Sequence, residues 1–241
     1  MLETKWLYLL LNLATICVPL LRSFESRVAY YKSFSSLFKS MLLVSGFFLL
    51  WDIWFTEMRV WGFTPDYLCG ISLFGLPLGE YLFFITVPFS CVFIYRVLDF
   101  FFPKGMVPKS LVVWLNYGLV ISCLAIGSLN LDKAYTSITF LLLAAAIIYV
   151  VWIEKVDWMG KFYQSYLIAL IPFILKNGIL TGSVTESPVV WYNNSENLGL
   201  RIATIPVEDV FYAMLLILGI IYFYDQEHSI EYIFYWNSGY S

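Results

Sequence analysis

Charged residues are scarce in this chain of 241 residues, at 13% of the total, and His228 is the single histidine. Hydrophobic residues make up 61% of the chain and aromatic residues 20%. A water-soluble domain usually has about a quarter of its residues charged, so this composition excludes an ordinary soluble domain. The net charge of −3 gives no reason to expect a nucleic-acid partner. We therefore expect a protein that resides in a membrane.

Sequence motifs that would indicate a metal or a dinucleotide are also missing. The cysteines are scattered without the spacing of metal ligands, at Cys17, Cys69, Cys91 and Cys123. No Gly-x-Gly-x-x-Gly fingerprint, which is typical of flavin and nicotinamide sites, is present. We therefore expect neither a metal nor an organic cofactor.

Long apolar runs dominate the chain instead. Runs of about 20 apolar residues with few charges are typical of membrane-spanning helices. The first run is short, but no small-residue cleavage site follows it, which favours a span over a signal peptide. We predict an all-α polytopic membrane protein with seven spans: Trp6–Leu21, Leu37–Phe55, Pro77–Leu98, Leu111–Leu129, Tyr135–Trp152, Phe162–Leu180 and Pro206–Tyr224.

Lysine and arginine are unevenly distributed between the two sides that seven spans define. Cytoplasmic loops of membrane proteins carry the excess of these residues. The bias predicts a cell-membrane protein with its N-terminus outside and its C-terminus in the cytoplasm. The richer side has Arg22, Arg27, Lys32, Lys39, Arg96, Lys104, Lys109, Lys155 and Lys161, and the other side has Lys5, Arg59, Lys133, Lys176 and Arg201.

An acidic motif occurs twice, each time where an apolar run begins. Residues 76–84 read LPLGEYLFF, and residues 204–212 read TIPVEDVFY. We expect each proline in the first turn of its helix, where a backbone N–H is not needed. Spans one to three and spans five to seven then form two parallel repeats, with the fourth span linking them. We therefore expect a first repeat at residues 1–103, a linking helix at 104–134 and a second repeat at 135–241. Both motifs should then lie at one depth around a shared cavity.

Two further segments, VVWYN at residues 189–193 and ENLGLRI at residues 196–202, precede the second motif. Together with the two acidic motifs, they make the chain resemble the small membrane lycopene cyclases, in the form in which both halves are fused into one chain. The resemblance covers nearly the whole sequence. Gly79 departs from the pattern, because the family often has a second acid there, so the resemblance implies no essential role for position 79 in this chain.

The resemblance implies an activity and a set of partners. The expected reaction is cyclisation of the linear ends of lycopene, usually to β-rings, which gives γ-carotene and then β-carotene. It involves no net redox change and would make the protein an intramolecular lyase, which is an isomerase. The implied partners are lycopene and the monocyclic carotene, both dissolved in the membrane, together with other enzymes of carotenoid synthesis.

Carboxyl groups near one depth are the candidates for the acid and the base that such a reaction needs. We expect Glu80, Glu208 and Asp209 to be catalytic, because two carboxyl groups that share one proton supply an acid and a base side by side. The alternative is that these residues only cap their helices, since acids in a first turn interact favourably with the helix dipole. Asp52 is a fourth candidate, with an ion pair to Lys176 as the alternative.

Aromatic side chains near these acids are candidates for stabilising a carbocation, because ring faces attract positive charge. The aromatic-rich loop Thr56–Leu76 is expected to form a lid over the cavity or a belt at the membrane interface. For each ring taken singly, the alternative is ordinary packing in a membrane helix or a place in the interfacial belt. Together with Asp52, the expected substrate-binding residues are Trp51, Trp61, Phe83, Phe84, Trp191, Phe211 and Tyr212.

Two other classes of protein compete with a cyclase. Paired acids in a parallel repeat also suit a proton-coupled transporter, although its acids would be expected at mid-membrane rather than at one face. A non-catalytic carotenoid-binding protein is the second alternative. A retinal protein is disfavoured, because the last span, Pro206–Tyr224, has no lysine that could form a Schiff base.

Overall fold

Helices make up most of the computed structural model, which describes residues 4–238 and side chains up to residue 227, so that of His228 lies outside the described part. Each of the seven predicted spans corresponds to one helix. Their bounds are α1 (Leu7–Arg22), α2 (Phe34–Glu57), α3 (Leu78–Phe101), α4 (Lys109–Leu129), α5 (Ala134–Ile148), α6 (Met159–Leu180) and α7 (Val207–Ser238). Short turns of 3-10 helix precede α2 (Tyr30–Ser33) and α3 (Pro65–Tyr67), and a π-helical turn (Tyr149–Ile153) extends α5.

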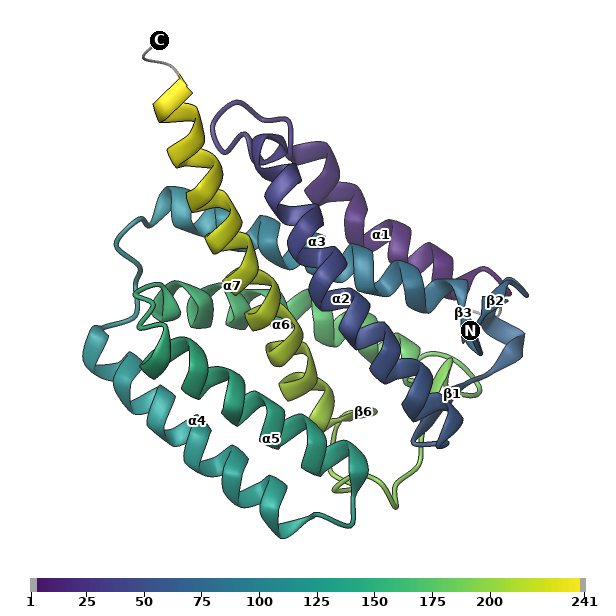
Figure 1. Cartoon of the computed structure of the whole chain (residues 1–241). Coiled ribbons are helices and arrows are strands. Elements are labelled where there is room, and N and C mark those ends of the chain that lie inside the picture. The colour runs from purple at the N-terminus through teal and green to yellow at the C-terminus, as the bar shows by residue number, and fades with distance from the viewer. Residues whose placement is uncertain (1–3, 239–241) are drawn as a thin grey trace.

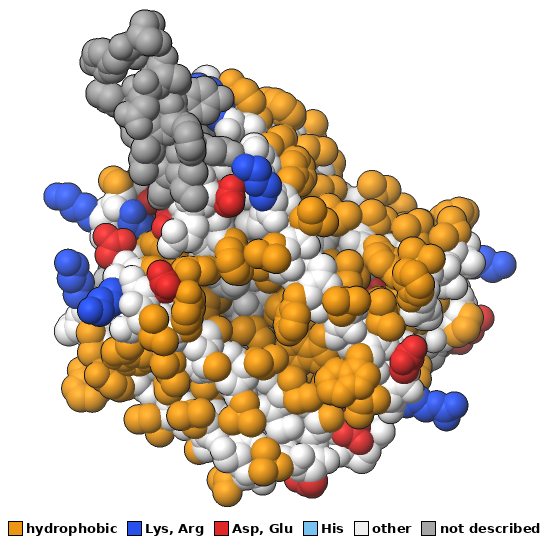
Figure 2. Space-filling model, viewed as in Figure 1, with side chains coloured by type: hydrophobic (Ala, Val, Ile, Leu, Met, Phe, Trp, Pro, Cys, Tyr) orange, Lys and Arg blue, Asp and Glu red, His pale blue; other side chains and the backbone are white. Residues whose placement is uncertain are grey.

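The helices identify an all-α polytopic membrane protein. Five of them, α2, α3, α4, α5 with its π-helical turn, and α7, are long and apolar enough to cross a membrane. Hydrophobic side chains are spread over the face seen in Figure 2, and charged side chains lie mainly toward its margins. Helix α1 is shorter, and α6 carries buried polar residues, among them Gln164, Lys176 and Asn177. These polar groups of α6 are placed inside the protein, where other residues can satisfy them.

Two short strands join the halves of the chain. β1 (Trp61–Phe63) follows α2 and pairs antiparallel with β4 (Val190–Tyr192), which follows α6, with Gly62 opposite Trp191 at the centre. These loops also precede α3 and α7. Their pairing therefore brings the starts of α3 and α7 to the same end of the molecule, as Figure 1 shows.

A two-fold relation connects the halves around this strand pair. On one side of the pair, the backbone N–H of Thr64 donates to the carbonyl of Val189, and on the other side that of Asn193 donates to Val60, both at 2.9 Å. A single shift in residue number carries one bond onto the other, with the two strands exchanged. The predicted parallel repeat is thus visible in the backbone hydrogen bonds.

The same shift relates two small hairpins that precede the acidic helices. Pro77 and Pro206 end these hairpins and lie in extended backbone, so the prediction that each proline occupies the first helical turn is wrong by one residue. The reason is that each proline pairs across its hairpin, with Ser72 and Arg201 respectively. The hairpins are β2–β3 (Ser72–Leu73 with Leu76–Pro77) and β5–β6 (Arg201–Ile202 with Ile205–Pro206).

The repeats interlock rather than stand side by side. Within the repeats, α1 packs against α3 and α5 packs against α7. The middle helices cross over, because α2 packs mainly against α7 of the other repeat and α6 mainly against α3. The linking helix α4 packs against α5. The start of each acidic helix is therefore surrounded by elements from both repeats.

Candidate active site

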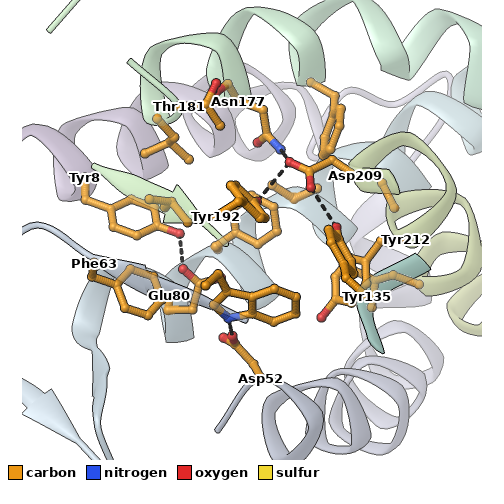
Figure 3. A pocket seen from close by; sticks show the side chains of 18 residues that line it. Tyr8, Asp52, Phe63, Glu80, Tyr135, Asn177, Thr181, Tyr192, Asp209 and Tyr212 are labelled. Carbon is orange, nitrogen blue, oxygen red and sulfur yellow. Dashed lines mark hydrogen bonds between the residues drawn. The ribbon is translucent and has the colours of Figure 1, made fainter. Parts of the chain in front are cut away.

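A small cavity lies beneath the paired strands, between the first turns of α3 and α7. Glu80 enters it from α3 and Asp209 from α7, as Figure 3 shows. Side chains from α1, α2, α5 and α6 complete the wall. The two acids meet because the hairpins and the strand pair fix the starts of α3 and α7 at one end of the molecule. The prediction that the two motifs meet in one cavity is fulfilled for Glu80 and Asp209.

Glu80 is held from the first helix. The hydroxyl of Tyr8 donates a hydrogen bond to its Oε2 (Figure 3). Below this contact, Asn12 is buried, and its Nδ2 donates to the carbonyl oxygens of Tyr8 at 3.0 Å and Gly79 at 2.9 Å. Asn12 therefore ties α1 to the beginning of α3 and fixes Tyr8 relative to the carboxylate.

Asp209 accepts hydrogen bonds from three side chains. Tyr135 donates to Oδ1 at 2.6 Å, while Tyr192 at 3.0 Å and Asn177 at 3.2 Å donate to Oδ2. Tyr192 lies on β4, outside the spans, and burial together with the Asp209 carboxylate raises the pKa of its hydroxyl well above the ordinary value. Its hydroxyl therefore remains a donor at neutral pH. Three donors aimed at one carboxylate are suited to holding negative charge.

Asp52 also lines the cavity, with Trp61 above it. The indole Nε1 of Trp61 donates to Oδ1 of Asp52, and the other oxygen, Oδ2, is buried without a hydrogen-bond partner. Among the described residues, Asp52 forms no ion pair with Lys176. The Lys176 amine instead donates to Oδ1 of Asn12 at 2.9 Å and lies 4.6 Å from the centre of the Phe83 ring. Trp61 and Phe63 of the loop after α2 line the cavity, so this loop covers it in the way expected of a lid.

Glu208 precedes Asp209 but does not line the cavity. Its Oε1 accepts hydrogen bonds from the Thr136 hydroxyl at 2.7 Å and from the backbone N–H of Leu198 at 2.8 Å. The side chain is completely buried. Glu208 therefore connects α5, the loop before β5 and α7. Gly79 is its counterpart in the first repeat, and the Tyr8 ring occupies the space in which a side chain at position 79 would lie.

The predicted aromatic residues divide into three groups: those that line the cavity, one that supports its wall, and those that lie elsewhere. Trp61, Phe83 and Tyr212 line the cavity. Trp51 contacts the Tyr212 ring from behind, with ring centres 5.0 Å apart, and so supports the cavity wall. The others lie elsewhere: Phe84 is buried beside Phe48 and Phe83, Phe211 packs on Phe140, and Trp191 lies over Gly62 on the outer side of the strand pair.

Several residues of the cavity were missed by the sequence analysis. Tyr8 and Tyr135 are the most informative, because each donates to the acid of its own repeat. The signal was present: each tyrosine lies shortly after the start of the first helix of its repeat, at nearly the same distance before its acid. The remaining missed residues are Phe63, Val87, Phe173, Asn177, Leu180, Thr181, Val190, Tyr192, Ala213 and Leu216.

The fold and the cavity define a membrane protein with carboxylic acids, phenols and aromatic rings enclosed at one end of its helices. The arrangement suits proton transfer to and from an apolar molecule. No group of histidine, cysteine and acidic side chains with the geometry of a metal site occurs among the described residues.

The family model for lycopene cyclase matches residues 5–98 and 132–226, so the chain belongs to the lycopene cyclase family. The two matched segments correspond to the two repeats, and the linking helix α4 falls between them. Searches of curated proteins and of solved structures gave no match. Membership makes the chain an enzyme that cyclises lycopene and places its substrates among the membrane carotenoids.

Proposed function

We propose that this enzyme converts the linear ends of lycopene to β-rings, giving γ-carotene and then β-carotene without net redox change. The observation that supports this most is the convergence of Glu80 and Asp209, from equivalent helix starts, on one cavity lined by aromatic rings. Two carboxyl groups and an apolar wall are the equipment that an acid-catalysed ring closure of a hydrocarbon requires. In this view the protein is an intramolecular lyase that needs no flavin.

The proposed reaction has three steps that conserve atoms and electrons. A carboxylic acid adds a proton to the isolated double bond at the end of the polyene, which leaves a carbocation on the neighbouring carbon. The next double bond attacks this carbon and closes a six-membered ring, so one carbon–carbon bond forms and the positive charge moves into the ring. A carboxylate then removes a proton from the adjacent carbon, which restores a double bond.

We assign the acid to Glu80 and the base to Asp209. Asp209 accepts three hydrogen bonds, from Tyr135, Tyr192 and Asn177, which stabilise its ionised form. Glu80 accepts one hydrogen bond, from Tyr8, at a single oxygen. Its second oxygen is free to present a proton to the cavity. After each turnover, the proton must return from Asp209 to Glu80, directly or through the phenols that surround the cavity.

Aromatic rings supply the stabilisation of the cation. Trp61, Phe83 and Tyr212 line the cavity with the acids, and ring faces attract positive charge more strongly when water is excluded. The lid formed by the paired strands separates these rings from the aqueous side. Glu208, outside the cavity, is proposed to contribute by fixing the start of α7 on which Asp209 lies.

The proposal is tested in a bacterial host that accumulates lycopene. Expression of the chain is expected to change the red pigment to orange-yellow, and chromatography should detect γ-carotene and β-carotene. The same conversion is expected in liposomes that contain the purified protein and lycopene but no flavin. If lycopene persists at normal protein levels, the proposed reaction is wrong. A product with an ε-ring would overturn the β-ring assignment alone.

A further inference from the structure

The cavity that holds the acids is too small for the whole substrate. Its volume is about 50 Å³, whereas the substrate is a long polyene with a reactive group at each end. At most one end of the molecule can therefore reach the acids, and the remaining chain must lie outside the cavity.

One apolar groove adjoins the cavity. It lies between α1, α3 and α6 and has a volume of about 260 Å³. Val87 of α3 and Phe173 of α6 line both the groove and the cavity, so the two spaces adjoin at these side chains. Val18, at the other end of the groove, is 63% exposed, and so the groove reaches the surface that faces the lipid.

The groove offers hydrocarbon to its occupant. Its two hydroxyl groups are turned to the backbone, because Thr15 donates to the carbonyl of Leu11 at 2.7 Å and Ser90 to that of Thr86 at 2.7 Å. The Lys176 amine, at the end near the cavity, is held by Asn12. An apolar chain can therefore lie in the groove without leaving any of these polar groups unpaired.

A second groove occupies the equivalent position in the other repeat, between α2, α5 and α7. Thr15, Val18 and Pro19 of α1 correspond to Leu142, Ala145 and Ala146 of α5. The same relation holds for the other walls. On α6 and α2, the corresponding residues are Ala169 and Val44, Pro172 and Phe47, and Phe173 and Phe48. On α3 and α7, they are Ser90 and Gly219, and Ile94 and Phe223.

The second groove is closed toward the acids. None of the residues that line it also lines the cavity. Phe48, Trp51 and Tyr212 form the partition, with ring centres 5.0 Å apart for Phe48–Tyr212 and for Trp51–Tyr212. In the first repeat, Lys176 takes the place of Trp51 and Phe83 the place of Tyr212, and Val87 and Phe173 line both spaces. The symmetry of the fold thus provides two grooves, of which one, the connected groove, adjoins the cavity.

We propose that the groove between α1, α3 and α6 binds the linear polyene chain of the substrate while one end of it occupies the acidic cavity. This inference rests on the proposed function, because it assumes that a carotenoid end reaches Glu80 and Asp209. The substrate then enters from the lipid with its end first, passing between Val87 and Phe173. For the second cyclisation, the monocyclic product leaves by the same groove and returns with its other end leading.

Matched substitutions in the two grooves test the proposal. Thr15→Trp fills the connected groove, and Leu142→Trp places the same side chain at the equivalent position of the closed groove. Thr15→Trp is expected to lower conversion of lycopene at least about tenfold, because burial of a few methylene-sized groups is lost. Leu142→Trp should stay within about twofold of the unmodified protein. Val18→Trp and Ala145→Trp form a second matched pair at exposed positions, where a larger side chain should not disturb folding. They keep the test decisive if either variant of the first pair misfolds.

Binding is measured separately in a Glu80→Gln background, which keeps lycopene unconverted. Lycopene that copurifies with the protein, expressed per mole of protein, should fall with Thr15→Trp and Val18→Trp and remain unchanged with their partners in α5. Equal pigment in all variants would overturn the proposal, as would a loss confined to the α5 variants. If the unmodified chain forms no rings, the proposed function fails, and the pigment ratio still shows whether this groove holds a polyene.

Discussion

Phe83 and Tyr212 occupy equivalent positions in the two repeats and both line the cavity, yet they meet different partners. The Lys176 amine lies 4.6 Å from the centre of the Phe83 ring, whereas the indole of Trp51 lies 5.0 Å from that of Tyr212. The Phe83 side of the cavity is therefore backed by a lysine amine and the Tyr212 side by an indole. Two halves with one fold have produced a site whose two sides differ in chemistry, so Glu80 and Asp209 lie in different surroundings.

The two cavity acids are expected to be essential. Glu80→Gln and Asp209→Asn should each lower conversion of lycopene by at least about a hundredfold, the usual effect of losing a general acid or base. Both substitutions keep the size of the side chain, so protein levels should stay normal. Glu57→Gln, at the exposed end of α2, is the control. Near-normal pigment conversion in both cavity variants would show that these carboxyl groups only cap their helices.

Loss of one donor to Asp209 should have a smaller effect that does not depend on pH. Tyr192→Phe removes a hydrogen bond to a charged group, worth about 1.5–3 kcal/mol, so activity should fall about tenfold or more. Because burial and Asp209 raise the pKa of Tyr192, its hydroxyl stays protonated below that pKa, and the loss should be the same at pH values of about 8 and 9. Liposome assays at both pH values measure this. Tyr81→Phe, which removes only an exposed bond to Leu73, is the control.

Gly79 should tolerate no side chain. A Cβ at this position would lie 2.5 Å from Cγ and Cδ1 of the Tyr8 ring, so Tyr8 would have to move away from Glu80. We expect Gly79→Ala to lower conversion by roughly tenfold to a hundredfold, as small displacements of catalytic groups do. Gly46→Ala in α2, where a Cβ would meet nothing within 4 Å, should leave activity intact. Equal activity of the two variants would contradict the positioning role of Tyr8.

Glu208 should affect stability more than its neighbour does. Glu208→Ala leaves the Thr136 hydroxyl and the Leu198 N–H without their acceptor in a buried place, at a cost of about 1–3 kcal/mol each. Glu208→Gln keeps an acceptor oxygen and should lose less. In detergent, Glu208→Gln should lower the melting temperature, and Glu208→Ala should lower it further. The melting temperature of Asp209→Asn should stay closer to that of the unmodified protein. A stable but inactive Glu208→Gln protein would place this residue in the chemistry.

Labelling of single cysteines tests the proposed orientation in the membrane. The paired strands place Asp66 and Glu196 at one end of the helices, and the element order places Ser36 and Lys104 at the other. From the excess of basic residues, we propose that the first end is outside and the second cytoplasmic. A reagent that cannot cross the membrane should label cysteines at 66 and 196 in intact cells. Labelling at 36 or 104 instead would reverse the topology and move the lid to the cytoplasm.

The sequence predicts those features that depend on patterns along a single helix. Apolar runs mark all seven helices, and the repeated motifs mark the starts of α3 and α7. The contacts of Tyr8 with Glu80 and of Lys176 with Asn12 could not be predicted in this way, because they depend on how helices rotate and cross. The interlocked packing of α2 and α6 has the same cause. β1 and β4 were missed because strands of three residues are too short for a recognisable alternation.

The central pair of the strands that join the repeats has a consequence for assembly. Gly62 and Trp191 face each other at the two-fold relation and are each other's counterparts, and a Cβ on Gly62 would collide with the Trp191 ring. Two copies of the first half would bring glycine against glycine and leave a gap, whereas two copies of the second would bring indole against indole. Each half therefore fits the other better than it fits itself. If the chain is cut within α4, the two different halves should reassemble with each other, because the Trp191 ring fits over Gly62.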